Sequence, residues 1–150
     1  MDFIGIGAQK AGTSWVYACL YEHPDICAPI KEIHFFSRPR YQEGIDSYER
    51  NFRNCKTDQL RGEFSTSYLY DERTAEHIFE HYPKAKIIAI LRNPVQRAYS
   101  QYRNSIKSGE VEKTTSFEEC AREEKSVVDQ GCYYKQLKRY YDLFSSDQIL

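Results

Sequence analysis

The sequence contains no long hydrophobic run and no excess of charge of either sign. No apolar stretch in its 150 residues approaches the roughly 20 residues of a membrane-spanning helix, and an apolar segment begins directly after Met1, which leaves no room for a signal peptide. The 21 Lys and Arg residues nearly balance the 22 Asp and Glu residues. Such a balance produces no overall field that attracts nucleic acid or an acidic membrane. We therefore expect neither a membrane segment nor a nucleic-acid partner.

Cysteine pairs with metal-binding or redox spacing are also missing. The five cysteines are Cys19, Cys27, Cys55, Cys120 and Cys132. An odd number of cysteines without a C-x-x-C pair argues against a disulfide framework and against a zinc site. We therefore expect reduced thiols, no metal and a cytoplasmic location. The sequence also lacks internal repeats and low-complexity tracts, and its length suits one domain over residues 1–150.

Apolar runs alternate with helical patterns along the chain. We expect strands near residues 2–6, 26–28, 61–64 and 86–91, and helices near residues 13–22, 45–52, 72–82, 94–107, 116–125 and 131–144. The isoleucine-rich run at residues 86–91 is typical of a parallel strand buried on both faces. Residues 148–150 resemble the start of a further strand, so we expect the fold to continue beyond Leu150. The alternation predicts an α/β fold of three layers, with a central parallel sheet flanked by helices.

A glycine-rich loop connects the first expected strand to the first expected helix. Gly7 and Gly12 have the spacing of the nucleotide P-loop, G-x-x-x-x-G-K-[ST], but Thr13 stands where that loop has its lysine and Lys10 precedes the second glycine instead. Backbone N–H groups and the positive end of a helix favour an oxyanion at such a place. We expect a phosphate group here without Mg²⁺. An ordinary turn between a strand and a helix needs the same glycines, so the loop alone does not distinguish a phosphate site from such a turn.

Two further segments bring polar groups to the same edge of the predicted sheet. Lys31, Glu32 and His34 precede two phenylalanines, and Arg92 follows the run at residues 86–91, with Ser100 on the helix after it. Ligands of open α/β sheets bind outside the carboxyl ends of the strands. We therefore expect these side chains and the glycine-rich loop to form one site.

Taken together, five segments in order carry a family resemblance. They read QKAGTSW, KEIHFF, GEFSTSYL, ILRNPVQRAYSQY, and GCYYKQLKRYYDLF followed by QIL. The chain resembles sulfotransferases that use 3′-phosphoadenosine 5′-phosphosulfate (PAPS) as the donor. It is most similar to the heparan-sulfate-type carbohydrate sulfotransferases and their bacterial relatives.

The resemblance implies a role for each matching residue. The donor would contact Lys10, Ala11, Gly12, Thr13, Ser14, Trp15, Arg92, Ser100 and Tyr133. Among these, residues 10–14 would wrap the 5′-phosphate, Arg92 and Ser100 would bind the 3′-phosphate, and Tyr133 would approach the same side of the nucleotide. The catalytic residues would be Glu32 as general base and Lys10 beside the leaving oxygen, with His34 as the runner-up base. No metal takes part.

The sequence leaves the acceptor and two other functions open. Heparan-sulfate-type members carry lysine where this chain has Phe64, which puts a strongly anionic glycan in doubt, so the acceptor is a small molecule or a glycan. A P-loop-type nucleotide kinase or NTPase is disfavoured by Thr13 and by Arg92 at a strand end where an acidic Mg²⁺ ligand would stand. A non-catalytic nucleotide-binding domain is the other alternative. Eukaryotic glycan relatives are Golgi proteins, so the Golgi lumen is the alternative to the cytoplasm.

Overall fold

The core of the fold is a parallel sheet, seen in a computed structural model that describes residues 1–37 and 39–150. Its strands are β1 (Phe3–Gly7), β2 (Ile26–Cys27), β3 (Leu60–Phe64) and β4 (Lys86–Ala89), in the order β2-β3-β1-β4 with all neighbours parallel. Beyond β4, Ile149 forms a parallel bridge with Ile87. The predicted parallel sheet is confirmed. Of the strand expected at 148–150, only the bridge at Ile149 forms, because Gln148 belongs to the 3₁₀ turn Ser146–Gln148.

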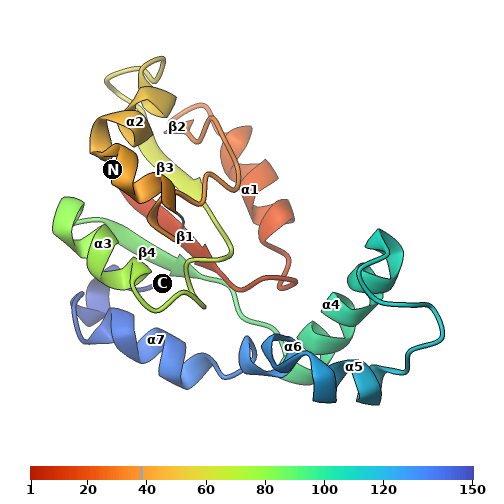
Figure 1. Cartoon of the computed structure of the whole chain (residues 1–150). Coiled ribbons are helices and arrows are strands. Elements are labelled where there is room, and N and C mark those ends of the chain that lie inside the picture. Colours follow the sequence, from red (N-terminus) through yellow and green to blue (C-terminus); the bar gives the residue numbers. More distant parts are fainter. Residues whose placement is uncertain (38) are drawn as a thin grey trace.

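Helices cover both faces of this sheet (Figure 1). Helix α1 (Thr13–Tyr21) packs on one face, while α3 (Thr74–His81) and α7 (Tyr133–Tyr141) pack on the other. Side chains of β1 alternate between the two layers, because Phe3 joins the cluster under α1 and Ile4 joins the larger cluster under α3 and α7. The three-layer prediction is therefore confirmed.

The larger cluster is rich in aromatic side chains. Helix α2 (Ile45–Glu49) and the 3₁₀ turn Arg50–Phe52 contribute Tyr48 and Phe52. Phe35 and Phe36, each 1% exposed, pack against Tyr48 with ring centroids 5.1 and 4.9 Å away. These two phenylalanines anchor the KEIHFF segment (residues 31–36) in the core, so its polar residues lie at the edge of the sheet.

Three helices form a group beyond the end of β4 (Figure 1). They are α4 (Pro94–Ser108), α5 (Phe117–Glu123) and α6 (Lys125–Asp129). The Asn93 side chain caps α4 by accepting hydrogen bonds from two backbone N–H groups of its first turn. Arg97 is fully buried and donates hydrogen bonds to Gln101 and to the carbonyl of Val127, which fastens α4 to α6. The separate helix α6 was not predicted.

The strand β4 corrects one prediction. Of its residues only Ile87 is fully buried, whereas Lys86 is exposed and Ile88 and Ala89 are half-buried. The isoleucine content of residues 86–91 had predicted a strand that is buried on both faces of the sheet. The strand lies at one edge of the four-stranded sheet, and strands at an edge are less covered than central ones.

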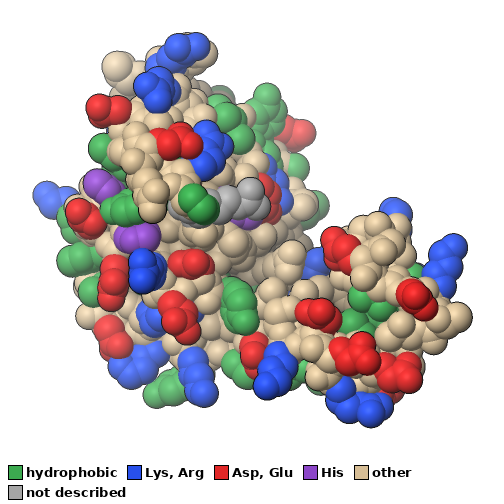
Figure 2. Space-filling view, in the orientation of Figure 1, with side chains coloured by type: hydrophobic (Ala, Val, Ile, Leu, Met, Phe, Trp, Pro, Cys, Tyr) green, Lys and Arg blue, Asp and Glu red, His purple; other side chains and the backbone are tan. Residues whose placement is uncertain are grey.

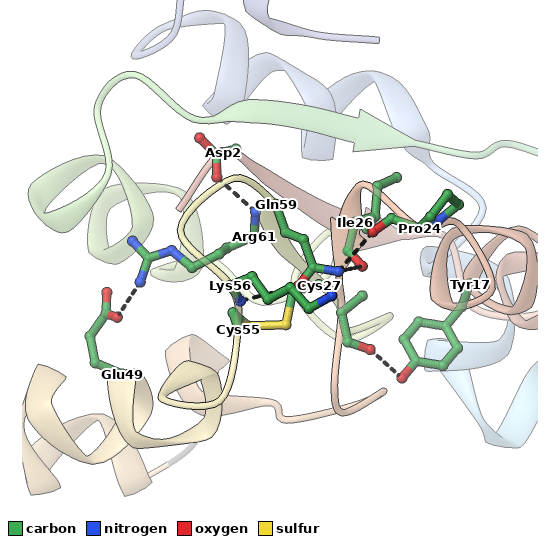
Figure 3. Close-up of a disulfide and its surroundings, with 11 residues drawn as sticks. Asp2, Tyr17, Pro24, Ile26, Cys27, Glu49, Cys55, Lys56, Gln59 and Arg61 are labelled. Atoms are coloured by element: carbon green, nitrogen blue, oxygen red, sulfur yellow. Dashed lines mark hydrogen bonds and ion pairs between the residues drawn. A yellow bond between two sulfur atoms is a disulfide. The ribbon is translucent and has the colours of Figure 1, made fainter.

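The expectation of reduced thiols is wrong for one pair of cysteines. Cys27 and Cys55 form a disulfide with their Cα atoms 5.6 Å apart (Figure 3). Cys27 lies in β2, and Cys55 lies in the turn before β3, the strand with which β2 pairs. Strand pairing brings these residues together across 28 positions, and no local spacing in the sequence shows it. The other cysteines, Cys19, Cys120 and Cys132, are free.

Hydrogen bonds support the same turn (Figure 3). The Gln59 amide donates to the carbonyl oxygens of Pro24 (2.8 Å) and Ile26 (3.4 Å). The Tyr17 hydroxyl donates to the carbonyl oxygen of Ala28 at 2.8 Å. The disulfide therefore belongs to a well-connected corner between α1, β2 and β3.

Surface charge shows no large area of a single sign on the face seen in Figure 2, where acidic and basic side chains are intermixed. None of the described helices is both long and apolar enough to cross a bilayer.

Candidate active site

The carboxyl ends of the strands bring the predicted segments together around one cavity of about 630 Å³. Its lining comes from the glycine-rich loop and α1, from the KEIHFF segment, from the residues after β3, and from α4 and the end of α6. The lining residues are Gln9, Lys10, Gly12, Thr13, Ser14, Lys31, Glu32, His34, Thr66, Ser67, Tyr70, Ser100 and Gln130. The structure therefore brings seven of the eleven predicted site residues to one cavity.

The start of α1 provides an anion-binding end. Gly12 is the N-cap residue with φ of 96°, a left-handed conformation that suits glycine, and an added Cβ would meet no atom within 4 Å. Conformation, not lack of space, therefore requires glycine here. Within the described residues no side chain caps the first turn of α1. The N–H groups of Thr13 and Ser14 have no partner among the described residues, and an anion is the ligand that such groups favour.

Arg92 and Tyr133 do not line the cavity, but hydrogen bonds connect them to Lys10, which does. The Arg92 guanidinium donates to the carbonyl oxygen of Lys10 at 3.2 Å, and the Tyr133 hydroxyl donates to the carbonyl oxygen of Arg92 at 3.0 Å. The Lys10 ammonium donates to Asn104 Oδ1 at 3.0 Å. Asn104 was not predicted. The signal that could have found it is its place one helical turn after Ser100 on α4.

Besides Arg92 and Tyr133, two further residues predicted to contact the donor do not line the cavity. Trp15 is 74% exposed, and neither Trp15 nor Ala11 lines the cavity. The Trp15 backbone N–H donates to the carbonyl oxygen of Gly12 at 3.0 Å. Any contribution of these two residues to donor binding therefore comes through the backbone or through a ligand that extends past the cavity.

Glu32 is held as an ionised carboxylate. Lys31 Nζ lies 2.7 Å from Oε1, while His34 Nε2 at 3.1 Å and the Thr66 backbone N–H at 2.9 Å reach Oε2. Burial alone would raise the pKa of Glu32, but the hydrogen bonds from His34, Lys31 and Thr66 outweigh it and lower the pKa to about 2. A proton acceptor is therefore present at the cavity wall.

Residues 65–67, which we call the hydroxyl loop, hold the KEIHFF segment in place. The His34 N–H donates to Ser65 Oγ at 2.9 Å, and His34 Nδ1 lies 2.6 Å from Ser67 Oγ. Thr66 Oγ1 donates to the Glu32 carboxylate at 3.1 Å. None of these three residues was predicted to have a role. The signal for them was a run of three hydroxyl side chains directly after a strand.

Backbone strain marks the same residues. Lys10, Glu32 and His34 have φ of 65°, 62° and 55°, and they are the only non-glycine residues in the described part of the chain with positive φ. This conformation costs on the order of 1–3 kcal/mol for each residue and persists where the surroundings impose it. The three strained residues are the three predicted to be catalytic, and strain of this kind clusters at functional sites.

Phe64 corrects the prediction about missing charge. Its side chain is fully buried under α1, and an added Cβ on Gly5 would lie 2.1 Å from its ring. Position 64 therefore belongs to the core between β1 and α1 and not to the cavity. Phenylalanine at this position removes no charge from the reacting centre.

A second cavity of about 730 Å³ adjoins the first and shares Ser67 and Tyr70 with it. Its other walls come from the start of α3 and from α7. They carry charged side chains of both signs, which are Asp71, Glu72, Arg73, Asp129, Lys135 and Arg139. The two cavities therefore have part of one wall in common.

Comparison with known protein families shows to which family the chain belongs. A family model described as the sulfotransferase domain matches residues 1–150. The chain belongs to the sulfotransferase domain family. The resemblance inferred from the five sequence segments is confirmed.

Similar proteins fit this membership. The chain is 33% identical over 135 residues to the membrane-associated sulfotransferase kil1 of Dictyostelium discoideum, covering 85% of this chain and 29% of that protein. It is 40% identical over 111 residues to the human bifunctional heparan sulfate N-deacetylase/N-sulfotransferase 3, covering 68% of this chain and 13% of that protein. The chain thus spans less than a third of the length of these relatives.

A solved structure has the same fold. The crystal structure of a sulfotransferase from Alicyclobacillus acidocaldarius superposes with a TM-score of 0.87 at 33% identity. The match covers 99% of this chain and 71% of that one. The α/β fold expected from the sequence is therefore that of a sulfotransferase.

Proposed function

We propose that this sulfotransferase-family chain transfers the sulfuryl group of PAPS to a hydroxyl or amine of a small-molecule or glycan acceptor. One observation carries the proposal. An ionised carboxylate, Glu32, lines the same cavity as Lys10 and the uncapped N-terminus of α1. A proton acceptor in one cavity with an anion-binding end is the arrangement that group transfer between a nucleophile and a phosphate leaving group needs.

The donor fits the residues present. The amides at the start of α1 take the 5′-phosphate, and the Lys10 ammonium approaches the oxygen that bridges phosphate and sulfur. Arg92 and Ser100 bind the 3′-phosphate, for which the planar guanidinium offers paired donors. Arg92 also donates a hydrogen bond from one guanidinium nitrogen to the Lys10 carbonyl oxygen. This hydrogen bond connects the proposed 3′-phosphate site to the glycine-rich loop.

The reaction forms one bond to sulfur as another breaks. The acceptor oxygen or nitrogen attacks sulfur in line, the bond between sulfur and the bridging oxygen breaks, and the acceptor proton passes to the Glu32 carboxylate. Lys10 offsets the negative charge that grows on the leaving phosphate oxygen. The sulfated acceptor and 3′-phosphoadenosine 5′-phosphate (PAP) are the products.

The low pKa of Glu32 makes it a weak base while Lys31 is bound to it. An anionic donor in the cavity competes for the Lys31 ammonium. Loss of that ion pair raises the pKa of Glu32 and strengthens it as a base when the donor is present. His34 is the alternative base, but its Nε2 faces the Glu32 carboxylate and its Nδ1 faces Ser67, so the geometry favours an orienting role.

The second cavity is our candidate for the acceptor. It shares Ser67 and Tyr70 with the first cavity, and the three acidic and three basic side chains on its walls balance in formal charge. Walls of this kind suit a polar acceptor rich in hydrogen-bonding groups.

Calorimetric titration with PAP tests the donor site, with AMP and ATP·Mg²⁺ as controls. We expect binding that requires the 3′-phosphate and weakens in Arg92→Ala. Equal binding of AMP would contradict the assignment of Arg92 and Ser100. Mg²⁺-dependent turnover of ATP would favour a P-loop-type kinase or NTPase, and PAP binding without sulfuryl transfer to any acceptor would favour a non-catalytic domain.

The cytoplasmic location expected from the sequence remains a prediction, and the Cys27–Cys55 disulfide weighs against it. Disulfides persist mainly in oxidising compartments, so the structure favours the alternative of a lumenal or extracytoplasmic site. Alkylation of free thiols in intact cells of the source organism tests this. Labelling of Cys27 and Cys55 there would support the cytoplasm.

A further inference from the structure

Glu63 is a buried carboxyl group that the proposed chemistry does not use. It lies on β3 and is 0% exposed, and no ion pair among the described residues includes it. Three hydroxyls donate to it instead. Tyr48 (3.0 Å) and Tyr68 (2.7 Å) reach Oε1, and Ser65 (2.7 Å) reaches Oε2. A buried carboxyl group stabilises the folded state less than an apolar side chain of similar size does. Its presence in an aromatic core therefore points to a role in positioning its hydrogen-bond partners.

The Ser65 hydroxyl connects Glu63 to the active site. A serine hydroxyl has one hydrogen, which rotates to suit its surroundings. The Ser65 hydroxyl uses that hydrogen to donate a hydrogen bond to Glu63. Ser65 Oγ therefore presents only lone pairs on its other side, where the His34 N–H donates to it at 2.9 Å. Glu63 thereby fixes the direction of the hydroxyl that holds His34.

The position of His34 in turn decides the geometry of Glu32. His34 has a left-handed backbone, with φ of 55°, that would relax without an imposed contact. Its ring reaches Glu32 Oε2 at 3.1 Å and Ser67 Oγ at 2.6 Å. A change in the backbone of His34 therefore moves the ring and removes a hydrogen bond from the Glu32 carboxylate.

We propose that Glu63 is a positioning residue which, through Ser65, fixes the backbone of His34 and with it the Glu32–His34 pair. The proposal rests on the proposed function only in assigning catalysis to Glu32 and His34.

The ionised form of Glu63 is the one that suits this role. A protonated carboxyl donates a hydrogen itself and competes with the Ser65 hydroxyl. Burial raises the pKa of Glu63 to about 7, although the hydrogen bonds from Tyr68, Ser65 and Tyr48 act to lower it. The titratable groups around it are these two tyrosines, His34 and Tyr82. We therefore expect kcat to rise as the pH rises through about 7.

The test compares Glu63→Gln and Ser65→Ala with two controls. Ser65→Thr keeps the hydroxyl, and Tyr48→Phe removes one hydrogen bond to Glu63 on the side away from Ser65. The rate is the release of PAP from PAPS, with water as the acceptor. Exchange of the His34 backbone N–H, followed by NMR, reports the Ser65 contact without any turnover.

We expect Glu63→Gln and Ser65→Ala to lower kcat on the order of 10- to 100-fold, to leave PAP affinity unchanged and to speed exchange of the His34 N–H. The rise of kcat through neutral pH should disappear in Glu63→Gln. Ser65→Thr should restore the rate, and Tyr48→Phe should lose stability but keep kcat. An equal loss of kcat in Tyr48→Phe, or unchanged His34 exchange in Ser65→Ala, would overturn the proposal.

The two proposals fail in different ways. If wild-type protein does not bind PAP, the proposed function fails, while the exchange of the His34 N–H still tests the link through Ser65. If Glu63→Gln does not fold, Ser65→Ala carries the same test, because it breaks the link and leaves both tyrosine hydrogen bonds to Glu63 in place.

Discussion

Breaking the Cys27–Cys55 disulfide should destabilise the protein strongly. The bond joins residues 28 positions apart. Chain-entropy arithmetic for a loop of that length gives about 3.5 kcal/mol of stabilisation at 25 °C, through restriction of the unfolded chain. For a domain of 150 residues this corresponds to a fall in Tm of roughly 7–14 °C. The double variant Cys27→Ser/Cys55→Ser and reduction of the wild-type protein should both produce it.

Differential scanning calorimetry with and without reductant measures this shift. The matched control is Cys19→Ser, because Cys19 is a free, exposed cysteine on α1. Its Tm should match that of the wild type and should fall equally on reduction. Thiol counting in the unfolded, unreduced protein should find three free thiols. Five reactive thiols, or a Tm that reductant does not change, would refute the pairing and the loop argument with it.

Two further predictions follow from the carboxylates. Glu32→Gln should reduce sulfuryl transfer by roughly 10²- to 10⁴-fold and leave PAP binding by calorimetry intact; wild-type rates would show that the base lies elsewhere. The folded-state pKa of Glu32 is lowered to about 2, so its contribution to stability, at most about 3 kcal/mol, is present above pH 4.5 and is lost as the pH falls toward 2. Glu63 acts in the opposite sense. Its folded-state pKa is raised to about 7, so its protonated form favours the folded state below pH 4.5 and this advantage is lost as the pH rises through 7. Urea unfolding between pH 3 and 8 measures both effects. The free energy of unfolding should decline from pH 5 to 8 in the wild type, and this decline should be absent in Glu63→Gln. Equal slopes of unfolding free energy against pH in the wild type and Glu63→Gln would contradict the raised pKa of Glu63.

The parts of the fold that the sequence predicted are those set by local patterns. An apolar run, two glycines and a helical pattern define β1, the loop and α1 without reference to the rest of the chain. Asn93 and Pro94 likewise predict the start of α4, and the structure places it there. Lys10, Glu32 and His34 could be found because their motifs are short and continuous.

The parts that could not be predicted depend on strand register. Cys27 meets Cys55 because β2 pairs with β3, and Ser65 meets His34 because the KEIHFF segment continues beside the end of β3. Neither pairing has a signature in local composition. Burial of Phe64 under α1 is a further case, because the alternation of faces along β3 decides it. Motif matching does not give the register of a strand. It therefore assigned a role in acceptor choice to Phe64, whose side chain lies in the core.

The catalytic segment is shaped from two sides, and this explains its strain. On one side Phe35 and Phe36 are fixed in the aromatic core, where the Phe36 carbonyl oxygen lies 2.9 Å from His77 Nδ1. On the other side the Glu32 N–H donates to the carbonyl oxygen of Phe64 at 2.8 Å, and the His34 N–H donates to Ser65 Oγ. Residues 32–34 must connect these two anchors within a few bonds, and left-handed φ at Glu32 and His34 is the conformation that results. The aromatic core and the hydroxyl loop thus set the distance between Glu32 and His34 jointly, so substitutions that displace the rings of Phe35 and Phe36 or break the Ser65 contact should change the rate before they change donor affinity.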